Sequence, residues 1–162
     1  MIRLKKIQES DLKVIYNLGF TQEYPFWASM NAPYFNEYKQ VTYEDFLKEY
    51  KPFFIRDEFI LGIYKDDAII GSVSAYWENK DTLWMSLGIV IYDDQMYGKG
   101  YGKQALSLWV DECFRKYPQL EHLGLTTWSG NAGMMKTAES LGMKMEAWIR
   151  KVRYYQDFYY DS

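Results

Sequence analysis

Three glycines alternate with lysine and tyrosine in one short stretch of the chain, residues 97–103, which reads YGKGYGK. The stretch lies between an apolar run and an amphipathic run, where a strand would lead into a helix. Glycine lets an anion approach the backbone N–H groups, and the first turn of a helix leaves its own N–H groups without intrahelical partners. With Lys99 and Lys103 beside them, these N–H groups predict a cradle for an anion such as a pyrophosphate, held without a metal.

Two common phosphate-binding motifs fit this stretch poorly. A P-loop has the pattern GxxxxGK[ST], but Gln104 follows Lys103, and Tyr97 stands where the first glycine would be. The hydroxyl that binds magnesium in a P-loop is therefore missing. A dinucleotide-binding GxGxxG motif would need glycine in place of Lys103.

The composition excludes several other kinds of site. The chain of 162 residues has a single cysteine, Cys113, and a single histidine, His122. One cysteine cannot form an internal disulfide or a cysteine-rich zinc site, and one histidine excludes the HExxH motif and three-histidine metal sites. We therefore expect no metal, Cys113 in the core, and His122 as a surface or strand-end residue rather than a catalytic base.

The charge balance and the hydropathy also limit the partners. Acidic residues outnumber basic ones by 22 to 19, for a net charge of −3. Because sequence-independent nucleic-acid binding needs a basic surface, we expect no nucleic-acid partner. No apolar run approaches the roughly 18 residues of a membrane span, and we see no N-terminal secretory signal. With no disulfide, these features predict a cytoplasmic protein without a membrane partner.

The order of the predicted elements indicates one mixed α/β domain over residues 1–162, without a linker or an internal repeat. The early strands would pair antiparallel, and the later ones would follow strand–helix–strand connections. Asn131 is expected to cap the last helix. We expect strands at 2–7, 59–64, 68–77, 83–92, 122–127, 143–154 and from 158 onward, and about four helices, at 9–18, from 42 onward, at 103–117 and at 131–141.

The glycine-rich stretch resembles the signature of one acetyltransferase family. Gln95, Gly98 and Gly100 match the Q/R-x-x-G-x-G/A pattern of the GCN5-related N-acetyltransferases (GNAT). Asn131, followed eleven residues later by Gly142, is similar to the N…GF segment of the same family, with methionine in place of the usual phenylalanine. The resemblance extends over the whole chain, and its C-terminal part looks most like the ribosomal-protein-type acetyltransferases.

The resemblance implies a GNAT fold, with acetyl-CoA as co-substrate. The implied fold is an α/β fold with a mixed, mostly antiparallel sheet, whose fourth and fifth strands splay apart. The pantetheine arm would pair with the end of the fourth strand, the pyrophosphate would bind the glycine-rich loop, and Asn131 would contact the pantetheine. The residues implied in cofactor binding are Val90, Ile91, Tyr92, Gln95, Gly98, Lys99, Gly100, Tyr101, Gly102, Lys103 and Asn131.

The proton-transfer residues do not carry over from the family, so the catalytic residues are unknown. Many members have tyrosine seven residues after the asparagine, and ribosomal-protein-type members often have serine three residues after it. Here these positions hold Ala138 and Met134. A lysine-type amine has a pKa of about 10.4 and an α-amine one of about 7.7–8.0. A site without a strong base therefore suits an α-amine, or an amine whose pKa a neighbouring charge already lowers.

Two functions stay open at this point. The first is an N-acetyltransferase that acts on a primary amine, either a peptide N-terminus or a small molecule. The second is a CoA-binding domain without transferase activity, because Ala138 and Met134 leave no family acid in place. Release of the CoA thiol across a panel of amines would separate the two.

An aromatic segment is the candidate wall of the acceptor site. Eleven aromatic residues fall between Tyr24 and Phe54, and aromatic rings can stack on an amine or a cation. The alternative is that these rings cover the sheet as ordinary core. The candidate substrate-binding residues are Trp27, Asn31 and Tyr34.

The ends of two later strands raise further expectations. Glu78 follows a predicted strand and would face either the acceptor or the solvent in a turn, and the pattern favours the turn. Residues 158–160 predict a short or truncated final strand with an aromatic edge. Because exposed strand edges pair with other chains, we expect a tendency to form a homodimer.

Overall fold

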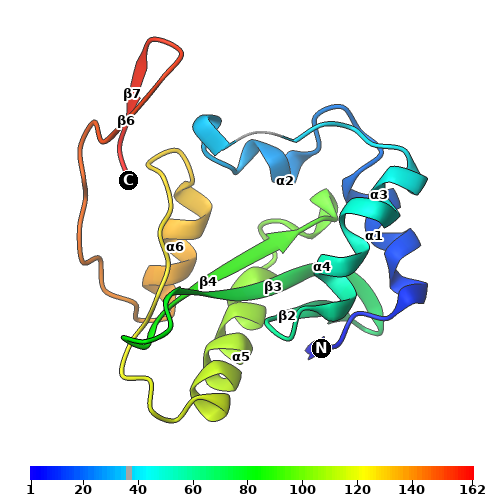
Figure 1. The fold of residues 1–162 in the computed structure, drawn as a ribbon, viewed down its shortest axis with the longest axis horizontal. Coiled ribbons are helices and arrows are strands. Elements are labelled where there is room, and N and C mark those ends of the chain that lie inside the picture. Colours follow the sequence, from blue (N-terminus) through cyan, green and yellow to red (C-terminus); the bar gives the residue numbers. More distant parts are fainter. Residues whose placement is uncertain (36–37) are drawn as a thin grey trace.

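A five-stranded sheet, in the order β1-β2-β3-β4-β5, forms the centre of the protein (Figure 1). The structure is a computed structural model that describes residues 1–35 and 38–162. The first four strands are antiparallel neighbours and β5 runs parallel to β4, which confirms the mixed, mostly antiparallel sheet. The strands are β1 Ile2–Lys5, β2 Ile60–Lys65, β3 Ala68–Asn79, β4 Trp84–Ile91 and β5 Leu123–Gly124.

Within the described residues the chain has six α-helices, against about four expected. One additional helix arises because the helix capped by Thr42 ends at Tyr50 and a new one follows. Pro52 lies in the first turn of that new helix, and its missing N–H removes the bond that a continuous helix would make to Lys48. The helices are α1 Leu12–Gly19, α2 Phe26–Ser29, α3 Tyr43–Glu49, α4 Lys51–Arg56, α5 Tyr101–Lys116 and α6 Ala132–Ser140.

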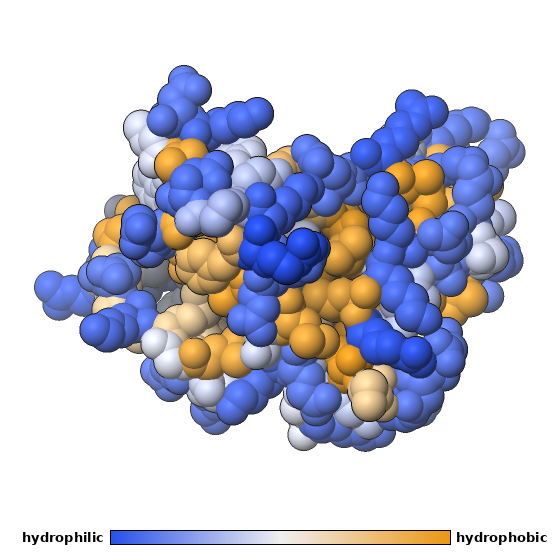
Figure 2. All heavy atoms as spheres, turned by 90° about the horizontal axis from the view of Figure 1, so that it is seen from below, coloured by the Kyte–Doolittle hydropathy of each residue, from blue (hydrophilic) through white to orange (hydrophobic). Residues whose placement is uncertain are grey.

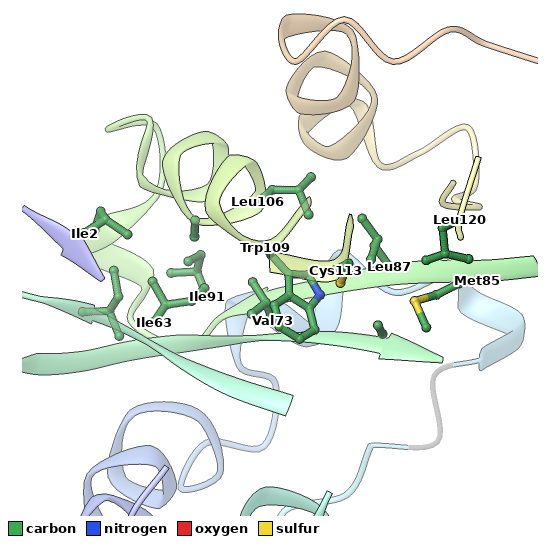
Figure 3. Packing of buried hydrophobic residues seen from close by; sticks show 13 residues of the cluster. Ile2, Ile63, Val73, Met85, Leu87, Ile91, Leu106, Trp109, Cys113 and Leu120 are labelled. Atoms are coloured by element: carbon green, nitrogen blue, oxygen red, sulfur yellow. The ribbon is translucent and has the colours of Figure 1, made fainter. Parts of the chain in front are cut away.

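Hydrophobic cores lie on both faces of the sheet. Helix α5 covers one face, where Leu106 and Trp109 pack with Val73 and Met85 of the strands (Figure 3). Helices α1, α3 and α4 cover the other face with a largely aromatic cluster in which Phe46 is fully buried. A large part of the aromatic segment is therefore core.

The C-terminal part differs from the sequence prediction. The predicted strand at 143–154 is wrong, because residues 143–152 adopt no strand structure. Instead, β6 Arg153–Tyr155 pairs with β7 Phe158–Tyr160 in a hairpin that stands apart from the sheet (Figure 1). The hairpin strands pair with each other, whereas β5, the strand at this edge of the sheet, has two residues and offers residues 143–152 few backbone groups to pair with.

The face of the molecule seen from below carries apolar side chains. Figure 2 shows them gathered in the middle of that face and bordered by polar side chains. Contiguous apolar surface of this kind is where folded proteins contact other molecules. None of the helices in the described ranges has the length and apolar character needed to cross a bilayer.

Candidate active site

A gap opens between β4 and β5. The two strands pair at only two positions, Met85 with Leu123 and Ser86 with Gly124. Beyond Ser86 the strand β4 continues to Ile91 without β5 beside it. The splay between the fourth and fifth strands is therefore confirmed.

Along the edge of β4 that faces the gap, every second residue directs its backbone N–H and C=O groups into the gap. Tyr92 donates its N–H to the carbonyl of Ile70 at 2.8 Å, which places the even-numbered residues of β4 toward β3. The N–H and C=O groups of the odd-numbered residues, such as Ile89, therefore point toward the gap. The hydroxyl of Tyr97 uses one of them, because it donates to the carbonyl of Ile91 at 2.9 Å.

The three predicted strand residues differ in what they present to the gap. Ile91 directs its backbone groups into the gap, whereas Val90 and Tyr92 direct theirs to β3. The Tyr92 ring is buried, its hydroxyl lies 3.0 Å from Ser72 Oγ, and burial raises the pKa of this tyrosine above its ordinary value. Ile89 shares the gap-facing edge with Ile91, and the alternation of strand residues is the signal that could have identified it.

The glycine-rich loop turns into α5 as the sequence predicted. Gly98 and Gly100 have φ angles of +72° and +76°, a region that favours glycine. A side-chain carbon added at either position would meet nothing within 4 Å, so the loop is open to a ligand. Among the described residues, Gln104 is the first in α5 to bond inside the helix, to the Gly100 carbonyl at 3.2 Å. The N–H groups of residues 101–103 are thus available to an anion.

Side chains around the loop support its shape and add positive charge. The carboxylate of Asp93 accepts the N–H of Gln95 at 3.0 Å. The side chains of Gln95, Lys99 and Lys103 are exposed, and that of Tyr101 is half-buried. Because the helix dipole and the two lysines act together, this end of α5 attracts anions.

Asn131 joins the last helix to the aromatic segment. Its Oδ1 accepts the N–H of Met134 at 3.0 Å, which confirms the predicted cap of α6. Its Nδ2 donates to the carbonyl of Met30 at 3.2 Å, and the indole N–H of Trp128 donates to the same carbonyl at 2.9 Å. Asn131 also lines the cavity at the end of the gap.

This cavity has a volume of about 560 Å³ and lies where β4 and β5 part. Residues 87–89 of β4, residues 125–128 after β5, and the segment with Asn31 and Tyr34 form its walls. Two of the three predicted acceptor residues therefore lie beside the gap-facing edge of β4. Arg153 of the C-terminal hairpin also lines the cavity, with its guanidinium 5.5 Å from the centre of the Tyr34 ring.

Trp27, the third predicted acceptor residue, packs in a core. Its indole N–H donates to the carbonyl of Gly19 at 2.7 Å. Its ring centre lies 5.5 Å from that of Phe20 and 6.0 Å from that of Tyr92. In the part of the chain that the structure describes, Trp27 does not line the cavity. The structure thus brings Asn31 and Tyr34 together and places Trp27 apart from them.

Glu78 lines the same cavity and is exposed, as the expected solvation requires, but it lies in a strand rather than in the expected turn. It belongs to β3, at a bulge where the register with β4 shifts between Trp77 and Asn79. The hydroxyl of buried Ser86 donates to Glu78 Oε1 at 2.9 Å. Burial raises the pKa of the neighbouring Tyr76, and the charge of Glu78 raises it further. Bulges turn side chains in directions that simple alternation does not predict.

A second cavity, of about 930 Å³, adjoins the first, and residues 125–128 line both. It separates β5 from residues 143–149 and is lined by His122 and Ala138. At one end of it, Ile149 and Ser162 exchange two backbone hydrogen bonds of 2.7 and 3.0 Å. Residues 87–89 line the smaller cavity and not this one. We therefore take the smaller cavity as the candidate active site.

A family model identifies the chain. The model described as an acetyltransferase (GNAT) domain matches residues 2–144. The chain belongs to the GNAT acetyltransferase family. This match confirms the family resemblance carried by the glycine-rich loop and Asn131.

Solved structures with the same fold support this assignment, whereas no curated protein matches the chain. A GNAT acetyltransferase from Bacillus anthracis has a TM-score of 0.75 at 15% identity, covering 99% of this chain and 90% of its own. YncA from Salmonella typhimurium, solved with its cofactor acetyl-CoA, has a TM-score of 0.70 at 18% identity, with 99% and 89% covered. A ribosomal-protein-alanine N-acetyltransferase from Brucella melitensis has a TM-score of 0.64 at 20% identity, with 99% and 94% covered. At these identities the likeness concerns the fold.

Proposed function

We propose that acetyl-CoA lies along the gap between β4 and β5 and that a primary amine meets its thioester in the 560 Å³ cavity. One observation carries this proposal. The gap has the available N–H groups of the glycine-rich loop at one end and the cavity at the other. A linear cofactor whose pyrophosphate binds the loop would therefore direct its thioester toward the cavity.

The loop and the strand edge give the cofactor two kinds of contact. The pyrophosphate would accept hydrogen bonds from the N–H groups at 98–103, each contributing about 1.5–3 kcal/mol because the acceptor is charged. Gln95, Lys99 and Lys103 lie around it. The pantetheine arm would bond to the gap-facing groups of Ile89 and Ile91 in the manner of an added strand.

The transfer itself needs a neutral amine next to the thioester. The amine nitrogen attacks the thioester carbonyl carbon, the C–N bond forms, the C–S bond breaks, and a proton from the nitrogen ends on the CoA sulfur. The positions that supply an acid in many relatives hold Ala138, which lines the other cavity, and Met134. We therefore assign no catalytic acid or base.

The acceptor is proposed as a primary amine of a peptide N-terminus or of a small molecule. Structural relatives include the ribosomal-protein-alanine N-acetyltransferase from Brucella melitensis and the spermidine/spermine N-acetyltransferase SpeG from Vibrio cholerae. Both kinds of acceptor agree with a site that lacks a strong base. An α-amine has an intrinsically lower pKa than a lysine-type amine, and a second ammonium group lowers the pKa of its neighbour.

Thiol release from acetyl-CoA, measured over a panel of peptide α-amines, lysine peptides, monoamines and diamines, tests this function. We expect release that depends on both acetyl-CoA and an amine. Binding of acetyl-CoA with no turnover on any amine would instead support a CoA-binding domain without transferase activity.

The cradle is tested separately by acetyl-CoA titration calorimetry. Neutralising the loop in Lys99→Gln and Lys103→Gln should weaken acetyl-CoA binding several-fold, and the loss should shrink at high salt. Lys6→Gln is the matched control, because Lys6 lies near Glu58, which pairs with Lys116 at the other end of α5. Equal affinities in all three variants would contradict the proposed position of the pyrophosphate.

A further inference from the structure

We propose that the acceptor carries a second, non-reacting cationic group and that Glu78 binds this group. The inference rests on the proposed function and narrows its substrate class to a short dication with two amino groups, such as an α,ω-diaminoalkane. Glu78 then acts as a specificity-determining residue for the acetyl transfer.

The carboxylate of Glu78 is held in place and keeps acceptor capacity for a ligand. Ser86, 3% exposed in the sheet, donates to its Oε1 at 2.9 Å. An ionised carboxylate has about four lone-pair positions, so one hydrogen bond leaves most of them available. In the described ranges, no lysine, arginine or histidine nitrogen lies within 4.0 Å of Glu78, although nine other ion pairs form. Glu78 is thus a negative charge in the cavity without a positive partner from the described chain.

Aromatic side chains line the same cavity as this carboxylate. Tyr76 and Trp84 are 48% and 55% exposed, so both are accessible to a ligand. Trp128 lines the cavity from the other side of the gap. A cation over the face of such rings is stabilised by about 0.5–2 kcal/mol. The other charged side chain of the described lining, Arg153, comes from the hairpin and stacks over Tyr34.

The spacing along β4 sets the distance between the two amino groups. The gap closes at the pair of Ser86 with Gly124, so an arm that enters from the glycine-rich loop ends before Ser86. A thioester beside Gly88 would lie two residues, or roughly 7 Å, from the level at which Ser86 holds Glu78. A reacting amine at the thioester and a second ammonium at Glu78 are therefore joined by an alkyl chain of about four carbon atoms, given that strand spacing.

Glu78 is better suited to bind the second ammonium group of the acceptor than to bind the reacting amine. An ionised carboxylate next to an ammonium favours its charged form and raises its pKa. At the reacting nitrogen this would lower the fraction of neutral nucleophile. At the distant nitrogen the same attraction orients the substrate and leaves the reacting amine near the thioester.

The test compares 1,4-diaminobutane with n-butylamine, which has the same chain and no second charge. Thiol release is measured for the wild-type chain, for Glu78→Gln, and for Glu121→Gln as an exposed control outside both cavities. We expect the wild-type chain and Glu121→Gln to prefer the diamine. In Glu78→Gln, the ratio of kcat/KM for the diamine to kcat/KM for n-butylamine should fall by roughly ten- to a hundredfold, the loss of a charged hydrogen bond.

The acetyl-CoA affinity of each variant, measured by calorimetry, shows whether Glu78→Gln keeps its fold and cofactor site. If the wild-type chain acetylates both amines equally, or if Glu78→Gln keeps the preference for the diamine, the inference is overturned and the proposed function stands. If no amine in the wider panel is acetylated although acetyl-CoA binds, both are overturned.

Discussion

Asn131 uses the two polar ends of its side chain for two different tasks. The oxygen caps α6, and the amide nitrogen ties the cap to the carbonyl of Met30 in the aromatic segment. The acceptor wall and the start of α6 are therefore joined through one side chain. If Asn131 also contacts the cofactor, its side chain makes that contact in addition to these two structural hydrogen bonds.

Replacing Asn131 with alanine should lower the free energy of unfolding by about 1 kcal/mol, the usual effect of removing an N-cap. Asn131→Asp is the matched control, because it keeps the capping oxygen and loses the amide donor. We expect urea unfolding to show a smaller loss for the aspartate variant. Equal stability of the alanine variant and the wild-type chain would contradict the capping role.

Cys113 is placed where its thiol should be unreactive. It is 3% exposed on the α5 side of the sheet, and burial raises the pKa of its thiol to about 12. We expect little reaction with a thiol reagent at pH 8 in the native chain and one equivalent after unfolding. The thiol of the unfolded chain has a pKa of about 8.5, so it ionises at a lower pH than the buried thiol of the folded chain. The free energy of unfolding should therefore fall progressively as pH rises from about 8.5 toward 12. Rapid native labelling would contradict the buried position.

At the scale of elements, the turn from β4 into α5 depends on backbone geometry that few residues tolerate. Gly100 precedes α5 with φ of +76°. Gly100→Ala should lower the free energy of unfolding by about 1–2 kcal/mol, the cost of a left-handed conformation for an L-residue. It should also weaken acetyl-CoA binding if the loop holds the pyrophosphate. Urea unfolding and calorimetry measure the two effects.

Gly133→Ala is the control for this substitution. Gly133 lies inside α6, where an added carbon would lie no closer than 3.8 Å to Asn131 Oδ1, and its backbone is helical. Alanine there should stabilise the helix by about 0.5–1 kcal/mol. If both alanine variants behaved alike, the argument from the φ angle of Gly100 would fail.

The sequence was sufficient to predict those elements whose patterns lie within a short stretch of the chain. The loop and α5 follow from alternating glycines and an amphipathic run, and the start of α6 follows from Asn131. The segment 143–152 reads as a strand, but a strand needs a neighbour, and pairing partners are not local information. Glu78 was expected in a turn rather than in β3 for a similar reason, because the bulge at this position depends on the register of β3 against β4.

At the scale of the whole molecule, the C-terminal hairpin presents an unusual amount of aromatic surface. Phe158 and Tyr159 are 66% and 61% exposed on a two-stranded unit, and such units expose pairing edges. We propose that they contribute to self-association, together with the apolar surface in Figure 2.

Light scattering over a range of concentrations tests this expectation. The wild-type chain should show a mass that rises with concentration, and Tyr159→Lys should reduce that rise. Tyr24→Lys is the matched control, because Tyr24 is 78% exposed and lies outside the strands. A strictly monomeric wild-type chain at high concentration would count against the proposal.

The cavity also carries indole rings that can report binding. Trp84 and Trp128 line it together with the larger cavity, and Trp148 lines the larger cavity, whereas Trp27, Trp77 and Trp109 pack in or against the two cores. Because indole emission depends on the polarity around the ring, a ligand that displaces water from Trp84 and Trp128 would change the emission spectrum of the chain. Binding in either cavity can thus be followed by intrinsic fluorescence, in an unlabelled chain and before any acetyl group is transferred.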